Sequence, residues 1–181
     1  IELLVVMAVI GILAGMLMPV LSSMKTKGKI TKAKAEINSI ITAVKQYETD
    51  YGVLPWAAGG ADKVFTTKTG TESGTETGYD DLMQLLTGVK KSDGTSVTGN
   101  VRNIRYLDTP NGYVSKGFLD PFGMKYRIYL DLDYNSQITL KPFGTGTPNP
   151  YNGTVAVYSF GSNKVTNSDE SNDSDDICSW K

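Results

Sequence analysis

The chain has 181 residues, of which 20% are charged and 40% hydrophobic, and a formal net charge of −1. This length has room for one modest folded domain besides a membrane-embedded segment. A net charge near zero provides no basic field for nucleic acid, which is therefore not expected as the main partner. The sequence has no histidine and one cysteine, which excludes histidine-based catalysis, His/Cys zinc sites and haem attached through C-x-x-C-H. We expect neither an enzyme nor a haem protein.

The chain opens with IELLVVMAVIGILAGMLMPVL, in which the nineteen residues from Leu3 to Leu21 carry no charge. A helix of this length crosses most of a ~30 Å hydrocarbon layer. A signal peptide would be shorter and end at a cleavage site, whereas Pro19 to Met24 lead directly into helical sequence. A buried core helix would need a larger protein around it. The pattern favours a membrane anchor that also packs against other copies of itself.

The apolar residues that follow recur every three or four positions, as on one face of a helix. They are Ile30, Ala33, Ile37, Ile40, Ile41, Val44, Tyr47 and Tyr51. Gly52 is expected to cap this helix, and Pro55 cannot extend it. The pattern predicts one nearly continuous helix from residue 1 to about residue 51, roughly 75 Å long.

The stretch IELLVVMAVIGILAGMLMP resembles the N-terminal segment of type IV pilins and type II secretion pseudopilins. Precursors of that family are cut by a prepilin peptidase before a phenylalanine that opens F-T-L-I-E. The shared features are I-E-L-L-V-V, small residues at Gly11, Ala14 and Gly15, and Pro19 at the expected offset. The family's F-T-L is not part of this sequence, which begins without Met, so we expect a chain that is processed or a piece of a longer one.

Four residues of this segment are candidate assembly residues: Glu2, Gly11, Gly15 and Pro19. Pro19, with the two glycines upstream, is expected to kink or locally melt the helix, because proline removes a backbone donor and clashes with the preceding turn. Glu2 could simply lie at the membrane interface, where the helix dipole favours it by a few tenths to about 1 kcal/mol. In a filament core its carboxylate would lie in low dielectric and need a cationic partner. The resemblance implies that this partner is the N-terminal amine of a neighbouring subunit, which is the interpretation we favour.

Five lysines follow the apolar segment, at Lys25, Lys27, Lys29, Lys32 and Lys34. By the positive-inside rule they would retain the rest of the chain in the cytoplasm, although a basic leader, removed on maturation in this family, could outweigh them. They are either a solvated helix face or a surface that contacts anionic lipid before assembly and acidic neighbours afterwards.

The middle of the chain reads as loops. Residues 57 to 78 are rich in Gly and Thr and are predicted to be an exposed excursion without a core. A short helix is predicted over DDLMQLLTG, with Leu82, Leu85 and Leu86 on one face and Gly88 at its end. The polar turn KKSDGTSVTGN and the segment VRNIRYLD follow, and neither contains a catalytic pattern.

Strands are predicted near the C-terminus, at KYRIYLD, SQITLKPF and TVAVYSF, which are rich in β-branched and aromatic residues. We expect an antiparallel sheet that covers the apolar helix face, since neither element can bury its apolar side alone. The turn between the first two strands, DLDYNS, looks like half an EF-hand loop at Asp131, Asp133 and Asn135. It has Ser136 in place of glycine and Pro142 in place of the final glutamate, so we interpret it as a hairpin turn.

The C-terminal region carries a second resemblance, to the major pseudopilin group. DPFGMKY resembles that group's D-P-W-G-x-x-Y, and YSFGSNKVTNSDESNDSDDICSW resembles its ending, Y-S-x-G-x-D with a later D-D-I-x-x-W. In that family the C-terminal loop binds calcium, which prefers six to eight oxygen ligands. The implied ligands are Asn163, Asp173, Asp175 and Asp176, with Ser159 and backbone carbonyls. Asn163 stands where the family pattern usually has Asp. The alternative to a calcium-binding loop is an acidic tail that is simply solvated.

The sequence thus predicts an α+β protein with a type IV pilin fold, in which a long N-terminal helix packs on a small antiparallel sheet. Residues 1–24 form the transmembrane and filament-core half of the helix, and residues 25–181 form the head. Within the head we expect an amphipathic helix over 25–52, a variable loop region over 53–117, and the sheet with its acidic loop over 118–181.

The expected function is that of a structural subunit of a type IV pilus-like filament that polymerises through the N-terminal helix. Its expected partners are other copies of itself, the bacterial inner membrane before assembly, the prepilin peptidase and an ATPase-driven assembly platform; no nucleotide site is expected. The assembled filament would be extracellular or span the periplasm. The alternatives are the major pseudopilin of a type II secretion pseudopilus and a membrane-anchored binding module whose loops 57–112 capture a ligand.

Overall fold

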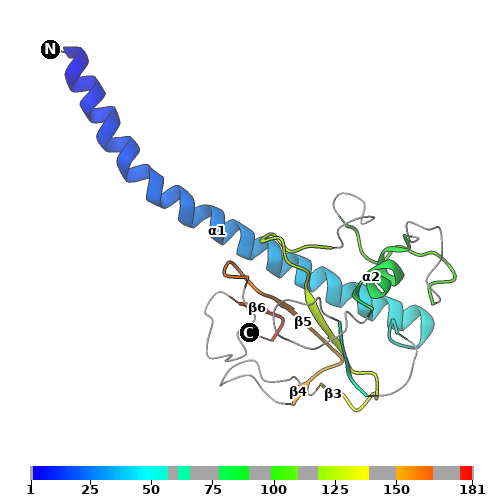
Figure 1. Ribbon diagram of the computed structural model, residues 1–181. Coiled ribbons are helices and arrows are strands. Elements are labelled where there is room, and N and C mark those ends of the chain that lie inside the picture. The colour runs from blue at the N-terminus through cyan, green and yellow to red at the C-terminus, as the bar shows by residue number, and fades with distance from the viewer. Residues whose placement is uncertain are drawn as a thin grey trace.

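The computed structural model describes residues 2–56, 61–65, 78–89, 99–109, 118–138, 150–164 and 176–180, without the side chains of residues 17–20. The fold is α+β. In chain order the elements are α1 (Glu2–Tyr51), β1 (Lys63–Phe65), α2 (Tyr79–Thr87), β2 (Arg127–Leu130), β3 (Gln137–Ile138), β4 (Tyr151–Asn152), β5 (Val155–Ser159) and β6 (Ile177–Cys178). Figure 1 shows the other elements gathered along the C-terminal half of α1, while its N-terminal half extends away from them.

Helix α1 confirms the predicted continuous helix and its end. It runs unbroken through Pro19, and Figure 1 shows that it bends along its length. After Tyr51 the chain turns at Gly52, whose φ of 72° lies in the left-handed region and whose N–H donates to the carbonyl of Glu48 at 2.8 Å. A residue without Cβ reaches this conformation at no steric cost, so Gly52 can end the helix. Pro55, three residues later, could not have continued it.

The short helix α2 is also where the sequence predicts it. Asp80 and Asp81 lie in its first turn, where the helix dipole favours negative charge. Gly88 ends the helix with a φ of 65°, and its N–H donates to the carbonyl of Gln84 at 2.9 Å. The predicted apolar face, with Leu82 among its residues, is buried.

The main sheet has four antiparallel strands in the order β1-β2-β5-β6. Its register pairs Lys63 with Leu130, and Ile128 with Val157. Strands β3 and β4 form a separate two-stranded sheet. The strands predicted at KYRIYLD and TVAVYSF are therefore neighbours in the main sheet, as β2 and β5.

The predicted hairpin across DLDYNS is wrong. Strand β2 pairs with β1 and β5, and β3 pairs with β4, so the residues on either side of the turn belong to different sheets. All four residues of β2 are buried, and because successive side chains point to opposite faces, both faces of this strand are covered. No edge of β2 is left for β3.

The prediction that residues 57 to 78 contribute no core is also wrong. Lys63–Phe65 form β1 at the edge of the main sheet, and the side chain of Phe65 is fully buried. A three-residue strand with one aromatic residue, set among Gly and Thr, is too short for its periodicity to stand out. The sheet therefore draws one strand from the region that the sequence assigns to loops.

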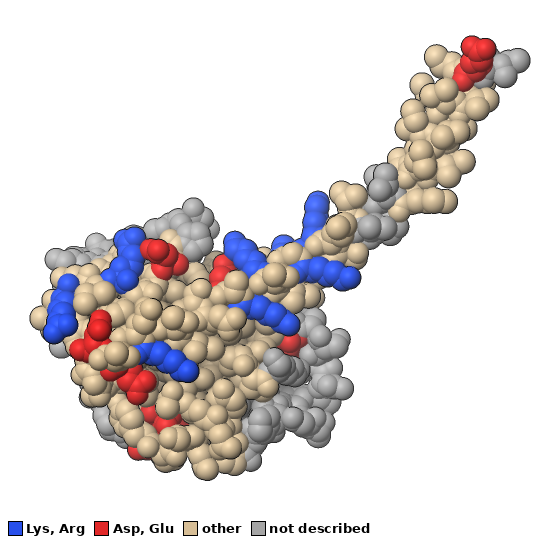
Figure 2. Space-filling model, turned by 180° about the vertical axis from the view of Figure 1, so that it is seen from behind, with Lys and Arg blue, Asp and Glu red and all other residues tan. Residues whose placement is uncertain are grey.

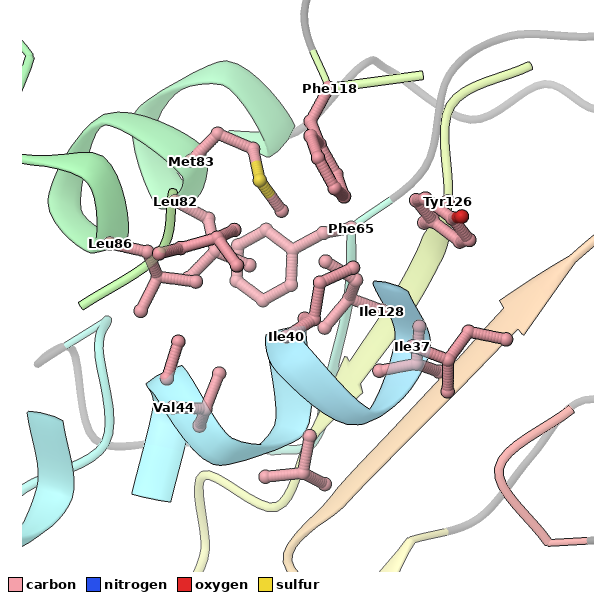
Figure 3. Close-up of a cluster of buried hydrophobic side chains, with 14 of the residues drawn as sticks. Ile37, Ile40, Val44, Phe65, Leu82, Met83, Leu86, Phe118, Tyr126 and Ile128 are labelled. Atoms are coloured by element: carbon pink, nitrogen blue, oxygen red, sulfur yellow. The ribbon is translucent and has the colours of Figure 1, made fainter. Parts of the chain in front are cut away.

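One core joins α1, α2 and the sheet. Figure 3 shows Phe65 lying among side chains from both helices and from β2, with Ile40 and Leu82 close to it. The buried residues of α1 are Ala33, Ile37, Ile40, Ala43, Val44 and Tyr47, with Ile30, Ile41 and Tyr51 partly buried against them. The predicted apolar face is thus confirmed as the face that packs against the sheet. The aromatic residues Tyr126, Tyr129 and Phe160 are buried, as expected of packing residues.

Candidate functional site

The N-terminal half of α1 is apolar and lies in solvent. Among the described residues its large apolar side chains are all exposed, from 50% for Val9 to 76% for Leu4. The helix includes a window long and apolar enough to cross a membrane, and none of that window is buried inside the protein. A soluble monomer rarely exposes this much continuous apolar surface. This half of α1 is therefore compatible with membrane anchoring, and it is not a core helix of the head.

Gly11 and Gly15 lie on the same side of this exposed half, four residues apart. Apart from the helix's own backbone, a Cβ added to either glycine would meet no described atom within 4 Å. Packing among the described residues therefore gives no reason for the missing side chains at these two positions. Small residues at this spacing allow two helices to approach closely in a membrane.

Glu2 lies at the free end of α1, and its side chain is exposed. It is the only charged residue on the helix before Lys25, which lies roughly 34 Å away along the helix axis. Figure 2 shows the same arrangement, an acidic end followed by an uncharged length. The described part of α1 therefore has no cationic side chain near Glu2.

The lysines after the apolar stretch lie where α1 joins the head, and Figure 2 shows basic side chains on more than one side of the helix there. All five are exposed. Lys32 lies 3.8 Å from Glu36, and the Lys29 ammonium lies 5.5 Å from the centre of the Phe122 ring. Within the described residues, Lys25, Lys27 and Lys34 form no ion pair.

The predicted calcium ligands are only partly described. Asp173 and Asp175 lie outside the described residues, whereas Asn163 is exposed after β5 and Asp176 directly precedes β6. Burial and a hydrogen bond with Asp176 raise the pKa of Tyr158, so this tyrosine keeps its proton and remains a donor to the carboxylate. The hydrogen bond between Asp176 and Tyr158 therefore links the start of β6 to β5. Carboxylate oxygens such as those of Asp176 are ligands that calcium prefers.

Ser159 has a structural role in the described network. Its hydroxyl donates to Asp120 Oδ2 at 2.6 Å, and both residues are buried. The other oxygen of Asp120 accepts the N–H groups of Phe122 at 3.0 Å and Met124 at 2.8 Å. Asp120 thus holds the turn of the DPFG segment against the end of β5. The Ser159 hydroxyl, which the sequence assigns to the calcium loop, is thus hydrogen-bonded to Asp120 in this structure.

The turn DLDYNS contains an acidic cluster that the sequence reveals only in part. Carboxylate oxygens of Asp62, Asp131 and Asp133 all lie within 4.8 Å of one another. Asp131 accepts the N–H of Ser136 at 2.8 Å, and Asp133 accepts the N–H of Asn135 at 3.1 Å. These bonds fold the turn back on the two aspartates. Three carboxylates at this spacing have the chemistry of a site for a hard cation, and exposed acidic groups are also common without one.

The pKa of Asp131 reflects this crowding. Burial raises it, a hydrogen bond and charge repulsion from Asp133 raise it further, and the backbone N–H groups of Ser136 and Asn135 lower it. The net direction is upward. A raised carboxyl pKa among other acidic groups means that a proton or a cation relieves repulsion in this turn.

Asp62 is the member of this cluster that sequence reasoning missed. It is 69 positions before Asp131 in the chain, and the pairing of Lys63 with Leu130 places the two side by side. Recognising strand β1 in the sequence would have placed Asp62 near Asp131, but three residues are too few to show a strand periodicity. The single cysteine, Cys178, is half-buried on β6 opposite Tyr158.

Comparisons with protein-family models, with curated proteins and with solved structures find no match to this chain.

Proposed function

We propose that this chain is the structural subunit of a type IV pilus-like filament, and that it polymerises through the exposed half of α1. The observation that carries the proposal is the division of one continuous helix into two halves. The second half buries one face in the core of the head, whereas the first half exposes large apolar side chains to solvent. The N-terminal stretch resembles that of pilins. This resemblance implies that the exposed apolar surface contacts lipid before assembly and other copies of the chain afterwards.

The proposed fold is the type IV pilin fold. Its support is the long N-terminal helix packed on a small antiparallel sheet, with a second helix and loops between them. Before assembly the apolar half of α1 lies in the inner membrane, where a helix satisfies all its own backbone hydrogen bonds. On assembly it exchanges lipid for the apolar halves of neighbouring subunits. A separate machine supplies the work, with an ATPase-driven assembly platform as the expected partner.

Glu2 has the role of setting the register between subunits. A carboxylate moved from the membrane interface into a bundle of apolar helices loses hydration, and an ion pair with a cation of the next subunit offsets that loss. The N-terminal amine of a neighbour is the cation that the family resemblance implies. Gly11 and Gly15 allow the helices to approach closely, and Pro19 lets the helix adapt its direction.

Calcium belongs to the proposal as a ligand of the C-terminal loop. The implied ligands are Asn163, Asp173, Asp175 and Asp176. Their amide and carboxylate oxygens suit a hard cation. When bound, calcium would neutralise the repulsion among these carboxylates and stiffen the loop. Asp176, joined to Tyr158, would connect the loop to β5.

The major pseudopilin of a type II secretion pseudopilus is the second candidate function. The DPFGMKY segment and the acidic ending favour it, because both resemble that group. Both functions require the same polymerising helix and differ in where the filament ends, at the cell surface or within the envelope.

The test of polymerisation is Glu2→Ala, compared with Glu48→Ala in the head half of the same helix. Both variants are produced in cells that carry the assembly machinery, and the chain is quantified in the membrane fraction and in the sheared filament fraction. Glu2→Ala is expected to insert normally and to be absent from filaments, whereas Glu48→Ala assembles. If Glu2→Ala assembles like the unchanged chain, the proposal fails. The anchored binding module predicts that outcome.

A further inference from the structure

The lysines at the junction of anchor and head lie on two opposite sides of the helix. We define the lysine collar as Lys25, Lys27, Lys29, Lys32 and Lys34, all exposed in this structure. At about 100° per residue, Lys25 and Lys29 lie on one side of α1 and Lys27 on the opposite side. A solvated face or a single docking partner needs charge on one side only. Charge on two opposite sides is what a planar surface crossed by the helix would meet.

The spacing along the helix fits a bilayer surface. The 22 residues from Leu3 to Met24 span roughly 33 Å as a helix, close to the ~30 Å hydrocarbon thickness. The collar begins at the next residue. Lys25 to Lys29 cover about 6 Å along the axis, which matches the headgroup layer on one side of a bilayer. Lys34 lies about 8 Å farther out, still within the Debye length of ~8–10 Å at physiological salt.

We propose that the lysine collar binds anionic phospholipid headgroups at the membrane surface from which the head emerges. The collar would fix how deeply the anchor inserts, with the first three lysines among the headgroups and the last two facing the surface. Among the described residues, Lys25, Lys27 and Lys34 have no intramolecular ion pair to satisfy them. The inference rests on the membrane-anchored state of the proposed function and does not require the filament.

The chain offers its own control. Lys45 is an exposed lysine on the same helix, 20 residues after Lys25, and therefore roughly 30 Å from it along the axis. That distance is about three Debye lengths at physiological salt. An anionic surface that reaches the collar does not reach Lys45.

The experiment places the full chain in lipid nanodiscs of phosphatidylcholine alone or with about one third phosphatidylglycerol. A water-soluble acetylating reagent is applied, and mass spectrometry measures the rate at each lysine. With phosphatidylglycerol, Lys25, Lys27 and Lys29 are expected to react about two- to fivefold more slowly, and Lys45 at an unchanged rate. The difference should vanish at about 1 M NaCl, where the Debye length is ~3 Å.

A second measurement removes the charge. Spin-labelled phosphatidylglycerol is expected to be immobilised around the unchanged chain more than spin-labelled phosphatidylcholine. The double substitution Lys25→Gln with Lys27→Gln should abolish that preference, whereas Lys45→Gln should leave it. Because the side chains of Lys25 and Lys27 make no hydrogen bond or ion pair with a described residue of the head, the double variant is expected to fold normally.

Several outcomes would overturn the proposal. Equal acetylation rates in both lipid mixtures would show that the collar does not recognise anionic lipid. Protection that depends on the number of chains per disc and not on phosphatidylglycerol would assign the collar to acidic surfaces of neighbouring subunits. A chain that fails to enter the discs would instead contradict the membrane-anchored state itself, and thus the proposed function.

Discussion

The hydroxyl of Tyr126 donates a 2.5 Å hydrogen bond to Glu36 Oε2, and so joins the start of β2 to helix α1 across 90 positions of sequence. Burial raises the pKa of Tyr126, and the bond to Glu36 raises it further, so the hydroxyl remains protonated at neutral pH. Lys32, a member of the lysine collar, lies 3.8 Å from the other oxygen of Glu36. The Tyr126–Glu36 bond therefore holds the head to α1 next to the collar.

Tyr126→Phe tests that connection. The substitution keeps the ring in the core and leaves the mostly buried Glu36 carboxylate without this donor. We expect the free energy of unfolding to fall by about 1.5–3 kcal/mol, the range for hydrogen bonds to charged groups. Urea unfolding of the full chain in detergent measures it. Tyr151→Phe, at a hydroxyl that makes no hydrogen bond with a described residue, is the control and should change stability little.

The acidic turn predicts a pH dependence. The pKa of Asp131 is raised in the folded state, so the folded chain binds its proton more tightly than the unfolded chain does. Its contribution to stability is therefore present below the ordinary aspartate pKa and is lost as pH rises through the raised pKa. Asp133→Asn removes one cause of the shift and keeps an oxygen that can accept the Asn135 N–H.

We expect Asp133→Asn to be more stable than the unchanged chain by roughly 0.5–1 kcal/mol at pH 7, a size typical of one like-charge contact. The two proteins should converge at about pH 3, where Asp131 is protonated in both. Thermal unfolding at a series of pH values measures this difference. A variant that is less stable at pH 7 would mean that the Asp133 charge holds the turn together.

The two glycines predict an effect on assembly without an effect on folding. Gly15→Leu adds a side chain where no described side chain lies within 4 Å of the new Cβ, and leucine favours helix more than glycine does. The monomer should therefore fold as before. In a bundle the added side chain would separate the helices, and we expect about tenfold less chain in the sheared filament fraction, equivalent to about 1.4 kcal/mol of assembly free energy.

Gly15→Ala is the matched control, since it keeps a small residue at the same position and should assemble nearly as well as the unchanged chain. Equal assembly of Gly15→Leu would place this face of α1 away from the contacts between subunits.

Calcium is expected to stabilise the head through its C-terminal loop. Adding calcium at about a hundred times its dissociation constant should raise the free energy of unfolding by about 2.7 kcal/mol. Asp176→Asn should remove most of this calcium-dependent increment, whereas Asp133→Asn should keep it. The increment is compared within each variant with and without chelator, because Asp176 also holds Tyr158. The opposite pattern would place the cation in the turn with Asp62 and Asp131.

The features that the sequence predicts well are local ones. The apolar period of residues 30 to 51 and the glycine at residue 52 define α1, because a helix is held by contacts within four residues. The same reasoning finds α2 and its glycine cap. Binary patterning also predicts which face of α1 is buried, since the apolar face has to pack on something.

The features that the sequence misses depend on distant pairing. The partner of β2 is chosen by which strands reach its two edges, so the short β1 and the later β5 take the places that a local hairpin would have used. Phe65 and Asp62 enter the core and the acidic turn for the same reason. The exposed half of α1 is clear from its apolar run. The calcium ligands of the C-terminal loop are assigned by resemblance to the family. Of these residues, Asp176 is hydrogen-bonded to Tyr158 of β5.

The central claim is that the exposed half of α1 is the core of a filament. Electron microscopy of the sheared surface fraction, with mass spectrometry of the fibres, tests it most directly. Fibres that contain this chain are expected. A chain that stays in the membrane fraction, in cells whose sheared and envelope fractions contain no fibre built from it, would rule out the filament and favour an anchored monomer.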